Sequence, residues 1–446
     1  MLALKKVYIE TYGCQMNVAD SELVGGVLDK SGYSLTPEIA EADVILVNTC
    51  AIRDNAEQRI HGRLGLFHRY KRKKPDLIVG VLGCMAERLR KDLIEEKKMV
   101  DIVVGPDEYR KLPELLGRAY EGEKGIAVRL SKVETYEDIE PLRTEGISAW
   151  ISVMRGCDKF CTFCVVPFTR GRERSRSLQS VVEEVRTLAR RGFREVTLLG
   201  QNVNSYIDGG YDFADLMKSV AEVDPHVRIR FTTSHPQDMS DKLIDTIARY
   251  DNLCKYIHLP VQSGSNRMLE LMNRTYTVEH YLGLIQKIRK AMPGASLTTD
   301  IISGFPTETE AEHQQTVRLM REVRYDGAYT FKYSPRENTK AWAMVDDVPE
   351  EEKGRRVYEI TRMQQGISSD VNRKLVGTTE RVLVDGPGRR SADERIGRTD
   401  TNKMVVFPQS NERAGEYAMV QIERTNSVTL FGSVVAGGSI RSVEAA

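Results

Sequence analysis

The sequence lacks any long hydrophobic run. No apolar segment among its 446 residues approaches the roughly 18 residues of a membrane-spanning helix, which argues against an integral membrane protein. The apolar part of the opening MLALKKVYIE is also too short for a secretory signal, and it runs directly into a strand-like pattern. We therefore expect a cytoplasmic protein with no membrane partner.

An excess of charge of one sign is missing as well. The 65 Lys and Arg residues nearly balance the 64 Asp and Glu residues, and a net charge of +1 argues against a general polyanion binder. The sequence contains no Gly-x-x-x-x-Gly-Lys-Ser/Thr loop for phosphate binding, and its seven histidines show no metal-binding spacing. It therefore offers neither a P-loop nucleotide site nor a histidine metal site.

The periodicity of the sequence predicts an α/β protein of three parts. Up to about residue 120, apolar strands alternate with helical stretches, which predicts a parallel, doubly wound sheet. The alternation resumes from 149 to about 335 and predicts a partial (β/α)6 barrel, and residues 349–373 predict one helix leading out of it. Short strands from residue 374 onward predict a small all-β barrel or sandwich, a type of domain that often binds nucleic acid.

We expect the boundaries between these parts to follow the composition. Residues 121–146 lack periodicity and are rich in Glu, Gly and Thr, which is typical of a linker. The expected parts are an N-terminal domain over 1–121, a linker over 122–146, the barrel and its helix over 147–373 and the β-rich domain over 374–440. The barrel strands are expected near 149–154, 195–199, 227–231, 255–259, 297–302 and 328–333.

The seven cysteines are an odd number, which argues against a fully paired set of disulfides. Cys157, Cys161 and Cys164 lie in RGCDKFCTFC, just after the predicted strand AWISVMRG, with the spacing C-x3-C-x2-C. No fourth cysteine or histidine lies within thirty residues on either side. Three thiolates in one tight loop can hold three corners of a cubane iron–sulfur cluster and leave the fourth iron open. A three-ligand zinc site, or unrelated core cysteines, are the alternatives.

Three further cysteines each end a predicted parallel strand of the N-terminal domain. Cys14 ends IETYGC, Cys50 ends ILVNTC and Cys84 ends GVLGC. The ends of parallel strands lie on one edge of a sheet, and neighbouring strands are roughly 5 Å apart, so the three thiols fall within reach of one cluster. The alternative is three small core residues, which is also our interpretation of Cys254.

The first cysteine loop resembles that of the radical S-adenosylmethionine (SAM) enzymes. In that superfamily the open iron binds SAM, whose cleavage generates a 5′-deoxyadenosyl radical. Together with the second set of cysteines, the whole chain resembles the methylthiotransferase family, which combines an N-terminal domain, a radical-SAM barrel and a C-terminal TRAM domain. The resemblance implies two [4Fe-4S] clusters and SAM as cofactors, with Cys14, Cys50 and Cys84 holding an auxiliary cluster and Cys157, Cys161 and Cys164 holding the radical-SAM cluster.

Several stretches resemble the tRNA branch of this family in particular. They are TYGCQMNVADSE, FCVVPFTRGRERSRS, LLGQNVNSY, HPQDMSD, HLPVQSGSNRMLELMNRTYT, TDIISGFPTETE and FKYSPRENTKA. The other branches, which act on threonylcarbamoyladenosine in tRNA or on an aspartate of a ribosomal protein, lack Gln-Met-Asn after the first cysteine. Small departures from the pattern, at Ser303, Thr307 and residues 336–338, concern loop details only.

The resemblance to the tRNA branch implies an activity. It implies conversion of N6-isopentenyladenosine at position 37 of tRNA to its 2-methylthio derivative, by radical activation of the adenine C2–H bond and sulfur insertion with two SAM. The other two branches remain alternatives, and an iron–sulfur protein that binds RNA or senses oxygen is an alternative of another class. The implied partners are a tRNA anticodon stem-loop and an electron donor such as flavodoxin or ferredoxin, and we expect a monomer.

Further contacts follow from the same resemblance. Polar residues at the ends of the predicted barrel strands are candidate SAM contacts, although each is equally a loop-capping residue. They are Gln201, Asn202, Ser234, Gln262, Asp300 and Ser303. Four arginines just after the cysteine loop, Arg170, Arg172, Arg174 and Arg176, are candidate RNA phosphate contacts. Phe407 and Phe431 in the β-rich domain are candidate base-stacking residues, with the domain core as the alternative.

Overall fold

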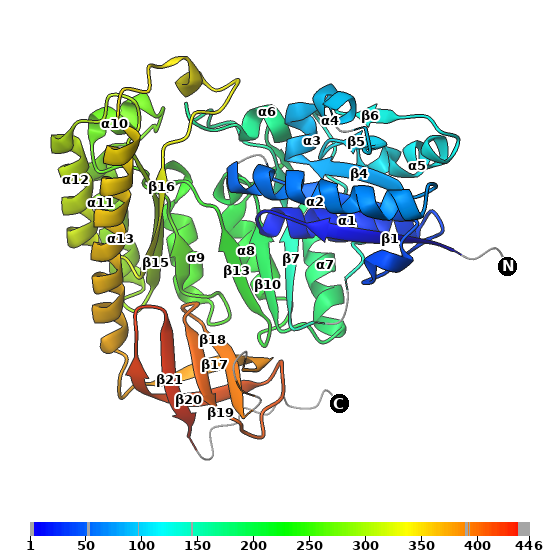
Figure 1. Cartoon of the computed structure of the whole chain (residues 1–446). Coiled ribbons are helices and arrows are strands. Elements are labelled where there is room, and N and C mark those ends of the chain that lie inside the picture. Colours follow the sequence, from blue (N-terminus) through cyan, green and yellow to red (C-terminus); the bar gives the residue numbers. More distant parts are fainter. Residues whose placement is uncertain are drawn as a thin grey trace.

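The computed structural model describes residues 4–50, 54–96, 98–143, 146–388, 391 and 393–435. Figure 1 shows three bodies in chain order: an N-terminal α/β domain, a central barrel and a small β-barrel at the C-terminal end. The predicted fold class is confirmed. Within the described residues, no helix is both long and apolar enough to span a membrane.

The N-terminal domain is a six-stranded parallel sheet with helices on both faces, in the strand order β2-β1-β3-β4-β5-β6. Its strands are β1 (Lys5–Thr11), β2 (Tyr33–Leu35), β3 (Val44–Thr49), β4 (Ile78–Gly83), β5 (Ile102–Val104) and β6 (Gly125–Ala127). Helices α1 (Gln15–Asp29) and α5 (Leu112–Tyr120) cover one face, and α2 (Asp54–Lys73), α3 (Cys84–Leu89) and α4 (Lys91–Glu96) cover the other. Short 3-10 turns are η1 (Ile39–Glu41) and η2 (Tyr109–Lys111). Alternate residues of the strands contribute to the two separate cores, as a doubly wound sheet requires.

The predicted linker over 122–146 is wrong for much of its length. β6 pairs with β5 as an edge strand of the N-terminal sheet. Tyr136 is buried in the core of the same domain, where its hydroxyl donates to the carbonyl oxygen of Pro106, at 3.0 Å. A three-residue strand and one buried tyrosine leave no periodicity that sequence analysis could detect. Residues 144–145 of the predicted linker lie outside the described residues.

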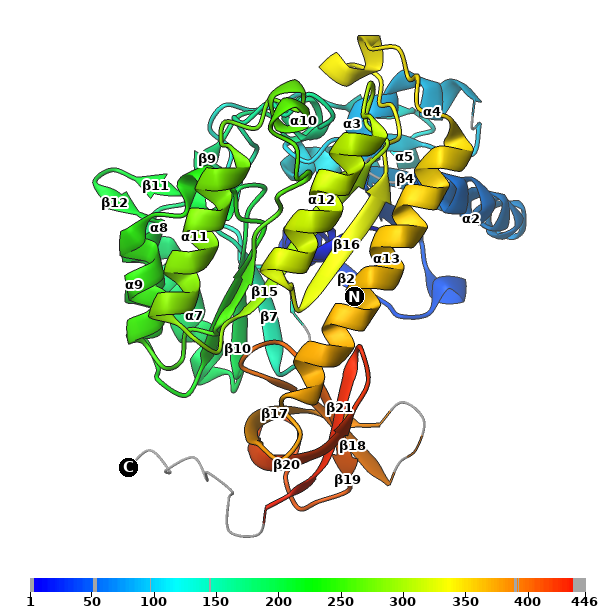
Figure 2. The same cartoon turned by 90° about the vertical axis from the view of Figure 1, so that its left-hand side faces the viewer.

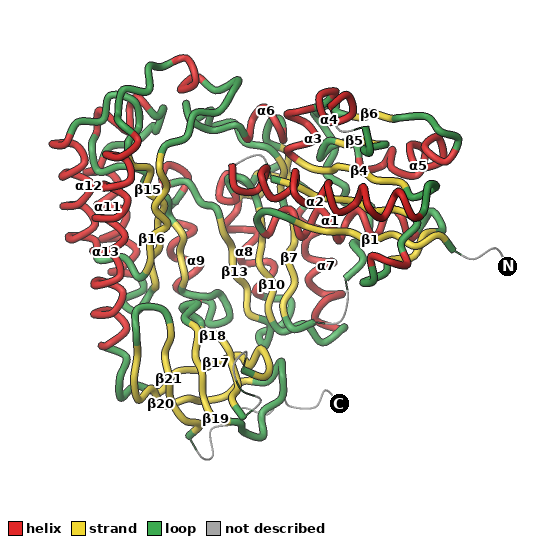
Figure 3. The backbone as a smooth tube through the Cα atoms, viewed as in Figure 1, coloured by secondary structure: helices red, strands yellow, loops and turns green. Residues whose placement is uncertain are grey.

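The central domain is a partial barrel of six parallel strands, close to the predicted positions. They are β7 (Ser148–Ser152), β10 (Glu195–Leu199), β13 (Arg228–Thr232), β14 (Tyr256–His258), β15 (Ser296–Ser303) and β16 (Gly327–Lys332). They form two three-stranded sheets, β13-β10-β7 and β14-β15-β16, linked by an isolated bridge between Ile229 and Leu253. Figure 3 shows β13, β10 and β7 side by side in the middle of the molecule, with β15 and β16 next to one another on the left.

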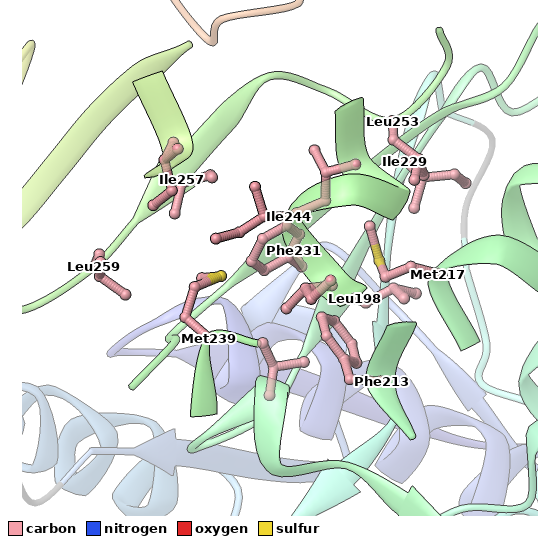
Figure 4. Close-up of a cluster of buried hydrophobic side chains, with 14 of the residues drawn as sticks. Leu198, Phe213, Met217, Ile229, Phe231, Met239, Ile244, Leu253, Ile257 and Leu259 are labelled. Atoms are coloured by element: carbon pink, nitrogen blue, oxygen red, sulfur yellow. The ribbon is translucent and has the colours of Figure 1, made fainter. Parts of the chain in front are cut away.

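Helices cover the outside of this barrel, and Figure 2 shows α11, α12 and α13 along one flank. The helices are α7 (Leu178–Arg190), α8 (Phe213–Ala221), α9 (Asp241–Arg249), α10 (Asn266–Leu271), α11 (Val278–Ala291), α12 (Glu310–Val323) and α13 (Glu350–Arg373). Shorter elements are β8 (Met154–Arg155), α6 (Val166–Arg170), β9 (Arg174–Ser175), η3 (Val203–Ser205), β11 (Ile207–Asp208), β12 (Tyr211–Asp212), η4 (Pro236–Asp238) and η5 (Lys340–Ala343). Figure 4 shows part of the core between strands and helices, where Leu198, Phe213 and Phe231 lie together.

The C-terminal domain is a closed five-stranded barrel in the order β17-β18-β19-β21-β20. Its strands are β17 (Thr379–Pro387), β18 (Glu394–Thr399), β19 (Met404–Pro408), β20 (Tyr417–Thr425) and β21 (Thr429–Val434). The polar strand β18 was not predicted. Phe407 is buried in the core of this barrel, so the prediction that its ring stacks on RNA bases is wrong. Residues 436–440 of the predicted domain lie outside the described part of the chain.

This small barrel docks on the central domain through buried arginines. Arg228 donates from Nη1 to the carbonyl oxygen of Arg398, and Arg230 donates from Nη2 to that of Thr399, both at 2.8 Å. Both arginines also pair with Glu195, which is the first residue of β10. The docking surface therefore lies at the amino ends of the barrel strands, opposite the end where the predicted cysteine loop begins (Figure 1).

Candidate functional site

Strand register brings the three N-terminal cysteines to one edge of the sheet. Thr11 is opposite Asn48 on β3, and Thr49 is opposite Gly83 on β4. Cys50 and Cys84 therefore leave adjacent strands at the same level, and Cys14 follows three residues after the end of β1. β1 and β3 are also where the strand order of the sheet reverses, which is the usual ligand position in open α/β sheets.

The turns at this edge pack closely. Gly13 has φ +140°, and a Cβ atom at this position would lie 2.8 Å from Cβ of Cys50. Asn17, in the first turn of α1, donates from Nδ2 to Oδ1 of Asn48 at 3.1 Å and to the carbonyl oxygen of Thr49 at 3.3 Å. The chain before and after Cys14 is thus held against the residues that precede Cys50.

Cys84 connects this edge to the central domain. Its side chain is buried against Val165, which is the residue after Cys164. Burial raises the pKa of the Cys84 thiol, whereas the nearby Arg170 guanidinium, which donates from Nε to Sγ at 3.1 Å, acts in the opposite direction. The two predicted cysteine sets are therefore in direct contact through Cys84 and the residue next to Cys164.

The second cysteine set lies in a loop whose shape is fixed by residues far away in sequence. Phe160 has the left-handed φ of +47°. Asn273 donates from Nδ2 to the carbonyl oxygens of Lys159 and Phe160, at 3.1 and 3.0 Å. The Thr162 hydroxyl donates to the carbonyl oxygen of Leu271 at 2.8 Å. The segment after α10 thus holds the cysteine loop in place.

The pKa values of two of these thiols are consistent with a site that is completed by metal ions. Desolvation by burial raises the pKa of Cys157 to about 12, and desolvation together with the neighbouring Cys161 does the same for Cys164. Without a cation, these thiols remain protonated at neutral pH. Bound metal ions deprotonate coordinating thiols, so three partly buried thiols in one loop match the donor set of an iron–sulfur cluster.

Arg274 is a residue of this site that sequence analysis missed. It donates from Nη1 to Sγ of Cys161 at 3.3 Å and from Nη2 to the carbonyl oxygen of Pro260 at 2.8 Å. Arg274 lies in the MNRTYT stretch that resembles the family, but nothing in a single sequence places it beside a cysteine 113 positions earlier.

Three of the candidate SAM contacts have buried polar atoms without a hydrogen-bond partner among the described residues. These are Oδ1 of Asn202, Oγ of Ser234 and Oγ of Ser303. Asn202 and Ser234 shortly follow β10 and β13, and Ser303 ends β15. A buried polar atom without a partner is costly, so this end of the barrel fits a polar ligand that completes these hydrogen bonds.

The other three candidate SAM contacts already have protein partners. Gln201 accepts a hydrogen bond through Oε1 from the backbone N–H of Gly156, at the start of the cysteine loop. Gln262 has φ +76° and donates its backbone N–H to the carbonyl oxygen of Asp300 at 2.9 Å. The carboxylate of Asp300 lies 3.5 Å from Nε2 of His258. We therefore interpret Gln201 as a residue that shapes the cysteine loop.

The prediction of RNA phosphate contacts is wrong for three of the four arginines. Arg170, Arg174 and Arg176 are buried and form ion pairs with Asp20, Asp107 and Glu184, at 2.8, 2.7 and 2.6 Å. Asp20 and Asp107 come from the N-terminal domain, and Glu184 lies one helix further on, eight positions after Arg176. The local excess of positive charge therefore did not show that the arginines were already paired.

Arg172 is the exception among the four. Its side chain is 62% exposed, pairs with Asp158 and lies over the ring of Phe160, with 4.9 Å from Cζ to the ring centre. It is therefore the one of the four that remains open to RNA.

A second group of possible metal ligands lies away from the cysteines. Oxygen and nitrogen atoms of Glu310, His313 and Glu359 lie within 4.8 Å of one another. The guanidinium of Arg355 already pairs with both glutamates, at 2.5 and 3.1 Å. The positive guanidinium group therefore already occupies the place beside the two glutamates that a metal ion would take.

Three family models match the chain. Residues 6–105 match "Uncharacterized protein family UPF0004", residues 151–320 match the radical SAM superfamily and residues 373–435 match the TRAM domain. These matches correspond to the three bodies of the structure.

Curated relatives match nearly the whole chain. The tRNA-2-methylthio-N(6)-dimethylallyladenosine synthase of Chloroherpeton thalassium is 53% identical over 433 residues, 96% of each chain. The enzyme of the same name from Parabacteroides distasonis is 52% identical over 438 residues, 97% of this chain and 96% of its own.

Solved structures support the fold. The radical S-adenosylmethionine methyltransferase TsrM of Kitasatospora setae covers 74% of this chain and 75% of its own, with a TM-score of 0.57 at 17% identity. The radical enzyme OxsB covers 80% of this chain and 56% of its own, with a TM-score of 0.54 at 13% identity. At these identities the likeness shows a shared fold.

Proposed function

We infer the reaction and its residues from one premise: the chain belongs to the family of tRNA-2-methylthio-N(6)-dimethylallyladenosine synthases. It is a radical-SAM methylthiotransferase that converts N6-isopentenyladenosine in tRNA to its 2-methylthio derivative. Its cofactors are two [4Fe-4S] clusters and SAM. When bound, they supply radical activation of the adenine C2–H bond and the sulfur and methyl group that replace the hydrogen.

We propose that each cysteine set holds one cluster. Cys157, Cys161 and Cys164 hold the radical-SAM cluster, and Cys14, Cys50 and Cys84 hold the auxiliary cluster. The observation that carries this proposal is the contact between Cys84 and Val165, because Val165 directly follows Cys164. Sulfur insertion requires the auxiliary site to lie within reach of the carbon atom that is activated, and this contact keeps the two sites adjacent.

The polar ends of the barrel strands bind SAM in this proposal. Asn202, Ser234 and Ser303 each have a buried oxygen atom without a partner, and the ammonium, hydroxyl and N–H groups of SAM are donors for such atoms. Gln201 and Asn273 act on the cysteine loop through its backbone. The chain thus provides placement, orientation and exclusion of water.

We propose that the tRNA approaches the cysteine edge with its anticodon stem-loop. The target adenine is splayed out of its stack, as bases are in other single-stranded RNA complexes. Arg172 contacts a phosphate near the cysteine loop, and the TRAM domain contacts the RNA at a second place. Because that domain docks at the opposite end of the barrel strands, the stem must run along the molecule. A flavodoxin or ferredoxin supplies electrons to a monomeric enzyme.

Anaerobic reconstitution with iron and sulfide tests the cluster assignment. The wild-type chain should bind about eight irons, and Cys14→Ala and Cys157→Ala should each bind about four. Cys254→Ala is the matched control, since Cys254 is a buried cysteine outside both sets, and it should retain about eight. An unchanged iron count in Cys14→Ala would contradict the auxiliary site. Nucleoside mass analysis of tRNA then shows whether N6-isopentenyladenosine or threonylcarbamoyladenosine gains the methylthio group.

A further inference from the structure

Arg170 lies where the N-terminal domain meets the central domain. It ends α6, which follows the cysteine loop, and its side chain reaches into the edge of the N-terminal sheet. Nε donates to Sγ of Cys84 at 3.1 Å, and Nη2 donates to Oδ2 of Asp20 at 2.8 Å. The third nitrogen, Nη1, is buried and has no hydrogen-bond partner among the described residues.

The charges around Arg170 do not balance within the network of ion pairs. Asp20 also accepts from Arg155 at 2.9 Å, and Asp107 accepts from Arg174 at 2.7 Å. The carboxylates of Asp20 and Asp107 therefore meet three guanidinium groups, all of them buried. One positive charge is left over, and a buried charge without a partner is costly. Among the described residues, the Cys84 thiol and the Tyr109 hydroxyl, which lies 3.5 Å from Oδ2 of Asp20, are hydrogen-bonded to this network and can lose a proton. Burial raises the pKa of Tyr109 well above its usual value, so the Cys84 thiolate is the better partner for the remaining positive charge.

Nη1 of Arg170 likewise requires a hydrogen-bond acceptor. A buried N–H donor without an acceptor costs about 1–3 kcal/mol, more when the group is charged. Nε already donates to Cys84, and Cys14 is near enough to add, after Asp20 and Cys84, to the interactions that raise the pKa of Arg170. An acceptor bound between these two cysteines would therefore lie near Nη1. The sulfur atoms of an iron–sulfur cluster are acceptors of this kind.

We propose that Arg170 is a positioning residue of the auxiliary cluster, supplied by the radical-SAM domain. Its Nε–H holds the Cys84 thiolate, its Nη1–H donates to a sulfur atom of the bound cluster, and its charge favours the reduced state of that cluster. The inference rests on the proposed assignment of Cys14, Cys50 and Cys84 to the auxiliary site. It makes the auxiliary site incomplete without the loop that carries the radical-SAM cysteines.

Arg274 makes the corresponding contact in the other site, with one difference. It donates to Sγ of Cys161, but its other nitrogens are satisfied by the Tyr276 hydroxyl and the Pro260 carbonyl oxygen. Each of the three nitrogens of Arg274 therefore has a protein partner. The unsatisfied Nη1 group sets Arg170 apart from it.

A redox titration of the auxiliary cluster tests the proposal. Reconstituted full-length Cys157→Ala protein, which lacks the radical-SAM cluster, provides the background, and electron paramagnetic resonance follows reduction. Adding Arg170→Gln removes the positive charge while Asp20 keeps Arg155 as its partner. We expect the reduction equilibrium to shift at least tenfold toward the oxidised state, which is about 59 mV for one electron. Arg172→Gln, an exposed arginine two residues away, is the charge-matched control and should shift it less than twofold.

The outcomes separate the proposal from the assignment on which it rests. If the Cys157→Ala protein binds no iron, the assignment of the auxiliary cysteines fails. If Arg170→Gln keeps about four irons and its reduction equilibrium differs less than twofold from that of the parent protein, the role of Arg170 is overturned. Loss of iron from a folded Arg170→Gln protein, with retention in Arg172→Gln, supports the role. If the Gln variant does not fold, Arg170→Lys decides, because it keeps the charge but carries all its donors on one nitrogen, which cannot replace the separate Nε, Nη1 and Nη2 groups. A smaller shift in the same direction supports the role of Arg170, and an unchanged potential overturns it.

Discussion

Thr49 of β3 lies directly opposite Gly83 of β4, and a cysteine follows each of them. This pairing sets Cys50 and Cys84 at the same level on adjacent strands. Because a shift of one residue would move one of them to another level, the register of two buried strands determines whether the auxiliary site exists.

Gly83→Ala should disturb this pairing. Gly83 has φ +89°, and a Cβ atom would lie 2.4 Å from Oδ1 of Asn48 and 2.6 Å from the carbonyl oxygen of Thr49. We expect the variant to lose about half of its iron and to unfold at a lower temperature than the wild type. Gly192→Ala is the matched control, because Gly192 has φ +88° but nothing within 4 Å of the new atom. It should show only the backbone cost of roughly 1–3 kcal/mol and keep its iron. An equal iron content in both variants would contradict the claim that the pairing of β3 with β4 at Gly83 positions the auxiliary site.

Asn17→Ala and Asn273→Gly should affect different clusters. Asn17 ties the Cys14 turn to Asn48 and Thr49, and Asn273 holds two carbonyl oxygens of the other cysteine loop. Removing the Asn17 side chain leaves its buried partners unsatisfied, which lowers the free energy of unfolding by about 1–3 kcal/mol. Mössbauer spectra of iron-57-reconstituted protein should show loss of auxiliary cluster in the first variant and of radical-SAM cluster in the second. Glycine is used at 273 because φ there is +56°. Loss of the same cluster from both variants would argue against the assignment of Asn17 to one cysteine set and Asn273 to the other.

Arg230→Met should loosen the TRAM domain without affecting the clusters. Arg230 is buried and joins Glu195 to the backbone of Thr399 and Asp400. Breaking a buried ion pair from one side costs on the order of 3 kcal/mol. We expect faster proteolysis near residues 374–378 and weaker tRNA binding, with about eight irons retained. Arg190→Met, on an exposed part of α7, is the control and should change none of these. A loss of iron would show that docking and cluster assembly are coupled.

His235 should make the apo protein sensitive to mild acid. Burial, with smaller contributions from Arg274 and Lys159, lowers the pKa of His235 to about 2. The unfolded chain binds this proton below a pKa of about 6.5 and the folded chain does not, so stability is complete above that pH and falls as the pH decreases. The loss should be about 1.4 kcal/mol at pH 5.5, measured by urea unfolding.

His235→Asn provides the comparison for this measurement. The backbone N–H of Gln237 donates to Nδ1 of His235, and the Asn side-chain oxygen can accept the same hydrogen bond. The difference in stability between pH 7.5 and pH 5.5 should shrink by about 1.4 kcal/mol in the variant. An unchanged difference would mean that other groups cause the acid sensitivity.

Sequence patterns predicted the parts of the molecule whose signals are local. Strand and helix periodicity predicted six barrel strands close to their observed positions, and cysteines that follow strands marked one end of the N-terminal sheet and one end of the barrel. The same approach failed where the signal was short or absent. It treated β6 and Tyr136 as linker, because three strand residues and one aromatic side chain have no period.

The sequence by itself therefore determined the three domains and the edge on which each cysteine set lies, since backbone periodicity and parallel strand direction are enough for both. Only the tertiary structure decided which charges meet. Arg170 finds Asp20 150 positions away, and Arg274 finds Cys161 113 positions away. Such pairs depend on how segments distant in the chain pack against one another, and a run of arginines looks the same in sequence whether it faces RNA or a buried carboxylate.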